Sequence, residues 1–177
     1  ASHAQGTHIP TDALGWVKKD NACGGYFADL PELTVSGNAI TMTSQHGMLQ
    51  LYDTSLLSGN ATITRPGQTL VATRMAFMRD PDTLKLTCAE LSSHIRLREP
   101  NALILAEHGL YCLKEDRKVL QYVLYRISLT SHLTAWGKAQ EISQQTPNIF
   151  DLKTASFSTC SPLSPTWHVT GSHIVVN

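Results

Sequence analysis

The chain has 177 residues, of which 42% are hydrophobic and 16% are charged. This composition is typical of one soluble domain that can bury a core without a metal ion or a disulfide. Fourteen Lys and Arg balance fourteen Asp and Glu, so the formal net charge is zero. That balance argues against a nucleic-acid-binding protein and against a basic protein of membrane surfaces. The longest apolar run, residues 102–106, is far shorter than the roughly 18 residues of a membrane-spanning helix.

The N-terminal residues 1–11 are small and polar and show no signal-peptide pattern. The four cysteines, at positions 23, 88, 112 and 160, are widely separated and form no Cys-x-x-Cys pair, so no metal site is predicted. An even number of dispersed cysteines is compatible with an oxidising compartment, and equally with buried thiols.

An internal repeat appears when the chain is shifted against itself by 34 residues (91 minus 57), because Leu57 then falls on Leu91 and Pro66 on Pro100. The repeat contains several Pro and Gly residues, which exclude helices of useful length. The segments between these breaks are short and rich in Thr, Val, Ile and aromatic residues, as strands are. The repeat unit is therefore predicted to be strand, turn, strand, turn.

Two segments compete with this pattern. Residues 119–127 also fit one face of a helix, but their Val and Tyr content and their alignment with Leu84 and Leu86 in the preceding copy favour a strand. Residues 138–145 contain no Pro or Gly. We expect one or two helical turns there.

The runs 75–78 and 103–105 are apolar on both side-chain parities, so both faces of a sheet are expected to be partly covered. The pattern predicts an all-β fold, an elongated and twisted β-jelly roll of two antiparallel sheets built from repeated hairpins. An apolar groove is expected between the sheets. If the sheets part, this groove can bind lipid.

The C-terminal region carries a specific pattern: Phe157-Ser158-Thr159-Cys160, a Pro-containing turn over 161–165, and then Trp167-His168-Val169. It resembles the closing hairpin of the periplasmic domain in the LptD family of lipopolysaccharide assembly proteins, also called the organic solvent tolerance or OstA family. The similarity extends over roughly residues 30–177. Cys23 resembles the N-terminal cysteine of the family.

This resemblance implies an N-terminal extension over 1–29 that carries Cys23, and an OstA-like β-jelly roll over 30–177, with the outer-membrane barrel absent from this chain. It implies lipopolysaccharide transport and outer-membrane biogenesis at the periplasmic face of the cell outer membrane of Gram-negative bacteria. The domain would shield acyl chains in its groove and pass lipopolysaccharide from the periplasmic bridge to the barrel. The implied partners are lipopolysaccharide, the bridge jelly-roll protein LptA, the LptD barrel and the lipoprotein LptE. No cofactor is implied.

In the family, cysteines that match Cys23 and Cys160 form disulfides with barrel cysteines that do not occur in this chain. Here the two thiols are free, mutually paired or capped, and the sequence leaves these states open. Cys88 and Cys112 depart from the family pattern. Cys88 lies on the same side of its strand as Leu84 and Leu86, and Cys112 on the same side as Leu110, so both are expected to point into the groove. A disulfide between them and two separate buried thiols are equally compatible with the sequence.

Shielding acyl tails is the physical task that the resemblance implies, because each methylene moved from water to an apolar lining contributes about 0.8 kcal/mol. We expect a groove that is open along one side and leaves the sugar headgroup in solvent. The candidate groove residues, each also compatible with an ordinary core position, are Ile63, Leu70, Ala72, Met75, Phe77, Leu84, Leu86, Leu103, Leu105, Leu110, Val123 and Phe157.

Transfer between proteins requires one groove to continue into the next. The exposed first strand, about residues 33–43, is expected to pair with the last strand of a similar partner by strand addition. The residues expected on this edge are Leu33, Val35, Ala39, Ile40 and Met42.

The sequence also bears on other functions. The eight histidines form no His-x-His motif, and no Gly-x-Ser-x-Gly nucleophile elbow is present, so no catalytic residue is predicted and the protein is not expected to be an enzyme. A free-standing periplasmic bridge protein of the same superfamily is one alternative, which the gene sequence after Asn177 would distinguish. A carbohydrate-binding β-sandwich is another, but aromatic residues make up only 7% of the chain.

Overall fold

The computed structural model describes residues 14–33, 37–131, 133–146, 148–160 and 167–177. The strands within these ranges are β1 (Trp16–Lys18), β2 (Gly25–Phe27), β3 (Thr41–Thr43), β4 (His46–Met48), β5 (Ser55–Arg65), β6 (Gln68–Arg79), β7 (Leu86–Glu99), β8 (Ala102–Cys112), β9 (Arg117–Thr130), β10 (Leu133–Thr146), β11 (Ile149–Phe157) and β12 (Val169–Val176). The predicted all-β class is confirmed. No helix long and apolar enough to cross a membrane occurs in the described ranges.

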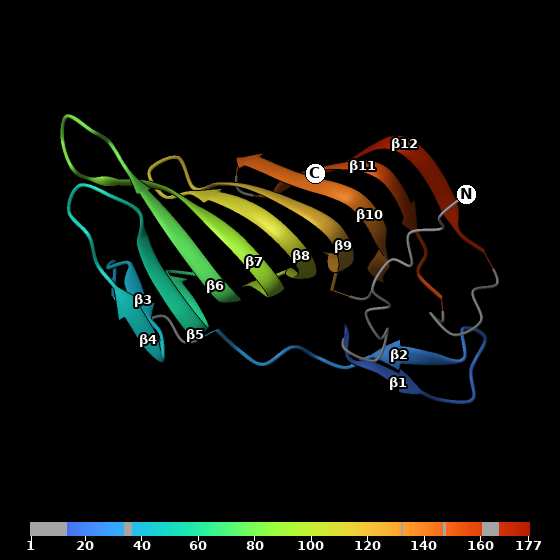
Figure 1. Cartoon of the computed structure of the whole chain (residues 1–177). Helices are drawn as coiled ribbons and strands as arrows, with labels where there is room; N and C mark the ends of the chain where they lie inside the picture. The colour runs from blue at the N-terminus through green and yellow to red at the C-terminus, as the bar shows by residue number, and fades with distance from the viewer. Residues whose placement is uncertain (1–13, 34–36, 132, 147, 161–166) are drawn as a thin grey trace, which may run out of the picture.

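One antiparallel sheet contains ten of these strands, in the order β12-β11-β10-β9-β8-β7-β6-β5-β3, and β4 pairs with the other end of β5. The sheet is elongated, with β3 and β4 at one end and β12 at the other (Figure 1). β1 and β2 form a separate hairpin.

The sequence repeat corresponds to hairpins. A shift of 34 residues carries the turn between β5 and β6, at Arg65 and Gln68, onto the turn between β7 and β8, at Glu99 and Ala102. Residues 119–127 lie in β9, so the predicted strand is confirmed there.

The helical turns expected over 138–145 are wrong, because this segment lies in β10 and pairs with β9 on one side and β11 on the other. Its buried residues Ala139 and Ile142 are three positions apart, which is a helical spacing. In β10 the spacing arises because the in-and-out alternation of side chains slips by one residue between them.

The same slip occurs in other long strands of the sheet. In β6, Leu70 and Ala72 face the core before it, and Met75 and Phe77 face the core after it. Register shifts accompany the slip between β5 and β6, β6 and β7, and β7 and β8. Residues with positive φ follow the same line across the sheet: Asn60, Ser93, His94, Tyr122 and Thr154. We call this line the crease.

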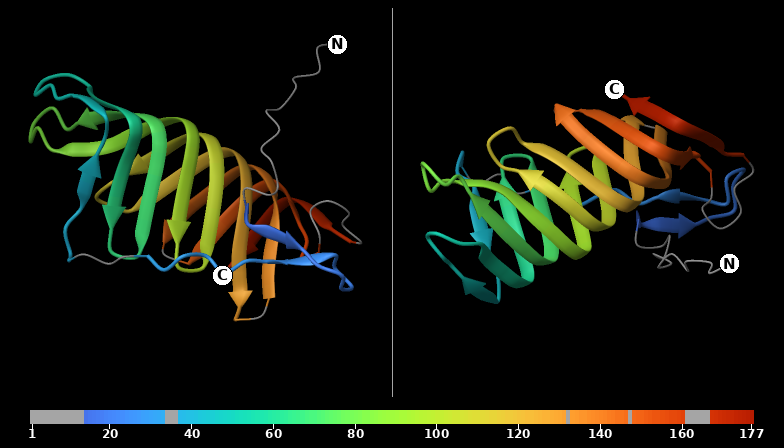
Figure 2. Two further views of the ribbon diagram at one scale, coloured as in Figure 1. Left: turned by 90° about the horizontal axis from the view of Figure 1, so that it is seen from below. Right: turned by 45° about the horizontal axis from the view of Figure 1, so that its top comes forward.

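The crease folds the sheet into two layers, and the long strands curve together along its length (Figure 2). Bulges and residues with positive φ bend strands in this way. The two predicted sheets are therefore the two halves of one continuous sheet. The main hydrophobic core lies between them and takes residues from both halves.

A second apolar cluster lies on the outer face of the sheet. Leu103, Leu124 and Trp136 pack there with Leu14, and Phe27 packs against the group. The N-terminal hairpin therefore covers part of the outer face. This cover explains why residues 103–105 are apolar on both parities.

Candidate functional site

The interior between the two layers is the candidate site, and it contains most of the predicted groove residues. The fully or almost fully buried ones in the main core are Ile63, Leu70, Ala72, Met75, Phe77 and Val123. Leu86 and Phe157 are partly buried and pack against the same core. The structure thus brings these eight residues together. Whether they contact lipid stays a prediction.

The remaining four candidates lie elsewhere. Leu103 and Leu105 alternate with Ile104, which faces the interior, so they point to the outer face and belong to the cluster under the N-terminal hairpin. Leu110 lines a hollow of about 480 Å³ together with His108 and Val119.

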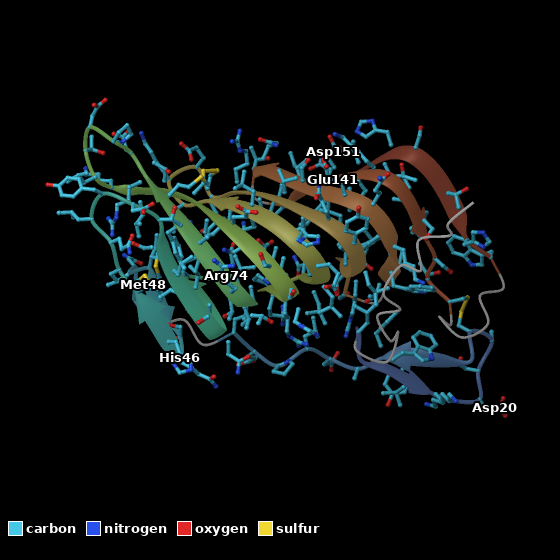
Figure 3. All side chains as sticks on the ribbon, in the orientation of Figure 1. Asp20, His46, Met48, Arg74, Glu141 and Asp151 are labelled. Atoms are coloured by element: carbon cyan, nitrogen blue, oxygen red, sulfur yellow. A yellow bond between two sulfur atoms is a disulfide. The ribbon has the colours of Figure 1, made fainter. Side chains whose placement is uncertain are left out.

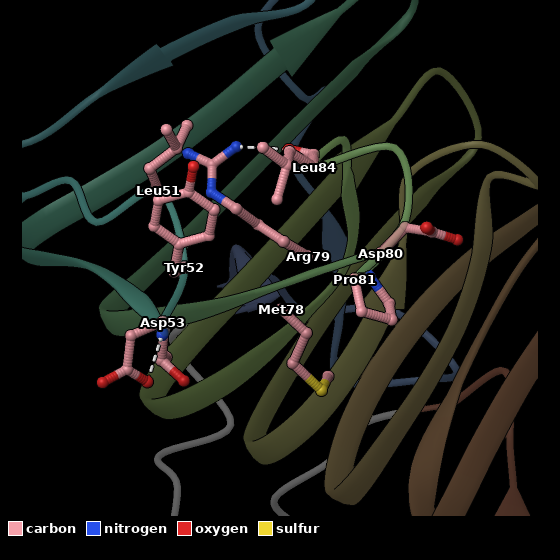
Figure 4. A pocket seen from close by; sticks show the side chains of 9 residues that line it. Leu51, Tyr52, Asp53, Met78, Arg79, Asp80, Pro81 and Leu84 are labelled. Carbon is pink, nitrogen blue, oxygen red and sulfur yellow. Dashed lines mark hydrogen bonds between the residues drawn. The ribbon is translucent and has the colours of Figure 1, made fainter.

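Leu84 lines a pocket of about 310 Å³ beside the turn between β6 and β7 (Figure 4). Arg79 crosses this pocket and donates hydrogen bonds to the carbonyl oxygens of Gln50 and Leu84, at 2.9 and 2.8 Å. The pocket is open and mixed in polarity, and it is separate from the interior.

The interior opens at the β12 end of the sheet. A pocket of about 330 Å³ there is lined mainly by apolar side chains of β9, β10, β11 and β12: Tyr125, Ile127, Leu129, Ala135, Phe157, Ile174, Val175 and Val176. Tyr125 is one of these lining residues, and its hydroxyl donates to the carbonyl oxygen of Ser156 at 2.7 Å. Burial raises the pKa of Tyr125, so this group stays a neutral donor. Asn177 also lines the pocket, beside these apolar side chains.

The opposite end of the sheet presents the predicted docking edge. Met42 in β3 is partly buried against the core, whereas Ile40 and Ala39 just before β3 are exposed. Leu33 is half-buried outside any strand, and Val35 lies outside the described residues. The edge is therefore shared by two short strands, β3 and β4, one on each side of the crease of β5.

An exposed apolar cluster beside this edge was missed from the sequence. It comprises Met48, Leu49, Leu51 and Tyr52, all more than half exposed. Figure 3 places Met48 and His46 of β4 at the far end of the molecule from Asp20. The signal that could have identified the cluster is a run of large apolar residues between Gly47 and Asp53, with no buried face to receive it.

Both cysteine pairs are bonded in the structure, Cys23 to Cys160 and Cys88 to Cys112. The second disulfide joins residues directly opposite each other on β7 and β8. Their neighbours Ala89 and Tyr111 face the core, so this disulfide lies on the outer face. Parity with Leu84 and Leu86 predicted the interior, but a register shift near the start of β7 reverses the alternation.

Arg126 anchors the N-terminal hairpin, and sequence reasoning did not identify it. Its guanidinium donates to the carbonyl oxygen of Leu14 at 3.1 Å and lies 5.0 Å from the ring centre of Phe27. Burial, and next the nearby charge of Arg98, lower its pKa. No group of three or more His, Cys, Asp or Glu residues in the described part of the chain could hold a metal ion. His173 contacts Asp151.

Comparison with curated proteins finds LPS-assembly proteins named LptD. The chain is 28% identical over 181 aligned residues to LptD of Coxiella burnetii, covering 93% of this chain and 21% of that protein. It is 26% identical to LptD of Legionella pneumophila (strain Lens), covering 93% and 20%, and 28% identical to LptD of Acinetobacter baylyi, covering 70% and 14%.

The chain thus spans about a fifth of the length of the first two relatives. No family model matches it. The resemblance to LptD that the C-terminal pattern indicated is confirmed and extends over nearly the whole chain.

Proposed function

We propose that this chain is the periplasmic part of a lipopolysaccharide assembly protein. Its interior shields the acyl chains of lipopolysaccharide at the periplasmic face of the outer membrane. Lipopolysaccharide arrives from a bridge of similar jelly rolls, formed by LptA, and leaves toward an outer-membrane barrel that works with LptE. The observation that carries the proposal is an apolar interior that runs along a folded sheet, in a chain similar to LptD over 93% of its length.

The position of the pocket supports a direction of travel. The interior is bounded at one end by the short strands β3 and β4, and it opens beside β12 at the other end. β12 is the last described strand of the chain. In our proposal the tails leave beside β12 toward the barrel. Each buried methylene contributes about 0.8 kcal/mol, so a short apolar path is enough to hold a tail.

Photocrosslinking tests the proposal directly. A photoreactive amino acid at Phe77 or Leu70, both in the interior, is expected to crosslink to lipopolysaccharide micelles. The same amino acid at Leu105, on the outer face, or at the exposed turn residue Asp82, is not. Lipopolysaccharide stripped of its acyl chains is not expected to compete. Equal labelling at interior and outer positions would disprove the proposed lipid-binding interior, and competition by the stripped sugar would favour a carbohydrate-binding protein.

The docking edge is tested separately. Ile40→Pro removes a backbone N–H beside β3 and is expected to weaken binding to LptA while the domain stays folded, because a proline cannot donate to a β-ladder. Ile40→Ala keeps the N–H and is the matched control. If both variants bind LptA like the wild type, the docking edge is elsewhere.

A further inference from the structure

The open side of the folded sheet, where the strand ends of the two layers face each other, is bridged by polar side chains. Arg65 Nη1 donates to Tyr111 Oη at 2.5 Å and to the Leu113 carbonyl oxygen at 3.2 Å, and it lies 3.2 Å from Asp116 Oδ1. Across the sheet, Tyr111 lies in the same row of paired residues as Ser55, the first residue of β5. Arg65 is the last residue of β5. In a flat sheet the row of Tyr111 and the row of Arg65 would lie about 33 Å apart, at about 3.3 Å per residue, so the contact between Arg65 and Tyr111 joins the two layers.

A second bridge lies beside the first. Lys118 Nζ is buried and donates to Gln144 Oε1 at 2.9 Å and to Glu99 Oε1 at 3.4 Å, and it lies 3.0 Å from Asp116 Oδ1. The Gln144 amide also donates to Glu99 Oε2 at 3.1 Å. Glu99 pairs with Ala102 of β8, which pairs with Ile127 near the end of β9. Lys118 lies near the start of β9. These bonds therefore also cross from one layer to the other.

The interior behind these bridges has no room for an acyl tail as it stands. Leu70, Met75, Phe77 and Leu97 are each at most 1% exposed and pack on one another across the two layers. Lipid can reach them only if the layers part. The polar seam itself adds little to the cost of parting the layers, because each charged group that loses its partner regains water. The main cost is the apolar interior area that is exposed, at about 25 cal/mol for each Å² that no lipid covers.

We propose that Arg65, Glu99, Tyr111, Asp116, Lys118 and Gln144 form a polar clasp that holds the two layers closed and releases to admit lipid from the side. The clasp rests on the proposed function and adds its regulation. The crease is the hinge opposite the clasp, and the pocket beside β12 is a separate exit that stays open. Loading and release thus use different openings of the same interior.

The variant that tests the clasp is Arg65→Met combined with Glu99→Met. It removes both groups that reach across from one layer, while Lys118 keeps Asp116 and Gln144 in its own layer. No buried charge is left unpaired, so the domain is expected to fold. The matched control is Glu141→Met combined with Lys153→Met, which removes one acid and one base whose ion pair joins neighbouring strands of one layer.

Two measurements are made on each variant. The rate at which lipopolysaccharide micelles label a photoreactive Phe77 is expected to rise about tenfold in the clasp variant, the factor that corresponds to about 1.4 kcal/mol of lost attraction. Amide hydrogen exchange at residues 65–68 and 112–118 is expected to accelerate without lipid. The control variant should match the wild type in both measurements. Arg65→Met alone is the milder version if the double variant does not fold.

The outcomes separate the two proposals. Wild-type labelling rates together with unchanged exchange in the clasp variants would overturn the clasp, and interior labelling in those same samples would leave the proposed function standing. If Phe77 is labelled in no variant, including the wild type, the proposed function fails and the clasp fails with it.

Discussion

The carbonyl oxygen of Ser156 lies against Gly137, only 1.8 Å from the position that a Cβ on this glycine would occupy. The same oxygen accepts the hydrogen bond from Tyr125 Oη. β9, β10 and β11 thus meet at one point beside the open end of the interior. Only glycine lets the backbones of β10 and β11 come this close.

Gly137→Ala is therefore expected to destabilise the domain by about 2 kcal/mol or more, because the backbone of β11 must move and the Tyr125 hydrogen bond weakens. Urea unfolding followed by circular dichroism measures the change. Gly47→Ala is the control, since its Cβ would meet the movable side chain of Leu57 at 3.3 Å, and it should cost less than about 1 kcal/mol. Equal effects of the two substitutions would contradict the close approach.

Tyr111→Phe isolates one hydroxyl of the clasp. The ring stays in the core, while the hydrogen bonds with Arg65 and Asp116 are lost. We expect the free energy of unfolding to fall by about 1–2 kcal/mol. Tyr122→Phe is the matched control because its side chain is 59% exposed, and it should have no measurable effect. A Tyr111→Phe variant as stable as the wild type would show that the hydroxyl contributes nothing to closure.

Much of the fold follows from local sequence. The repeat that places Pro66 over Pro100 predicted two hairpins, and their turns lie where the repeat places them. Within each half of β6, alternation of side chains accounts for the interior pairs Leu70 with Ala72 and Met75 with Phe77. These features are local, because a turn and the strands beside it are specified by neighbouring residues.

The crease could not be predicted, since a one-residue slip in a strand gives the same three-residue spacing as a helix. The helical turns expected over 138–145 rested on the absence of Pro and Gly, which a long paired strand such as β10 satisfies equally well. Leu105 was predicted in the interior but lies on the outer face. The alternation of side chains shows which residues share a face of the sheet, but it does not show which face is the inner one. Arg65 and Tyr111 are 46 residues apart, and only the folding of the whole sheet brings them together.

The disulfide between Cys88 and Cys112 is expected to stabilise the domain by about 3 kcal/mol, from the closure of a chain segment of this length in the unfolded state. The test variant combines Cys88→Ala with Cys112→Ala. Alanine is used rather than serine because position 112 is only 2% exposed, and a serine there would bury a hydroxyl. Urea unfolding of the variant against the oxidised wild type measures the loss. Alkylation of the folded wild type without reductant should modify no cysteine at these positions. Full alkylation there would exclude the bond.

Asp80 links the stability of the turn between β6 and β7 to pH. Its carboxylate accepts backbone hydrogen bonds from Thr83 and Asp82, both at 2.9 Å, and these bonds lower its pKa below the ordinary value of 3.8. A depressed carboxyl pKa stabilises the folded state above the ordinary pKa, and this contribution is lost as the pH falls through the folded value. Amide exchange of Asp82 and Thr83 should therefore accelerate below about pH 4, after correction for the intrinsic rate. Asp80→Asn cannot ionise and should remove this pH dependence.

Asp53→Asn is the control. The Asp53 carboxylate accepts a hydrogen bond from the adjacent Thr54 amide, and its loss should leave the pH dependence at Asp82 and Thr83 unchanged. If Asp80→Asn shows the same acid-induced opening of the turn as the wild type, a group other than Asp80 causes that opening.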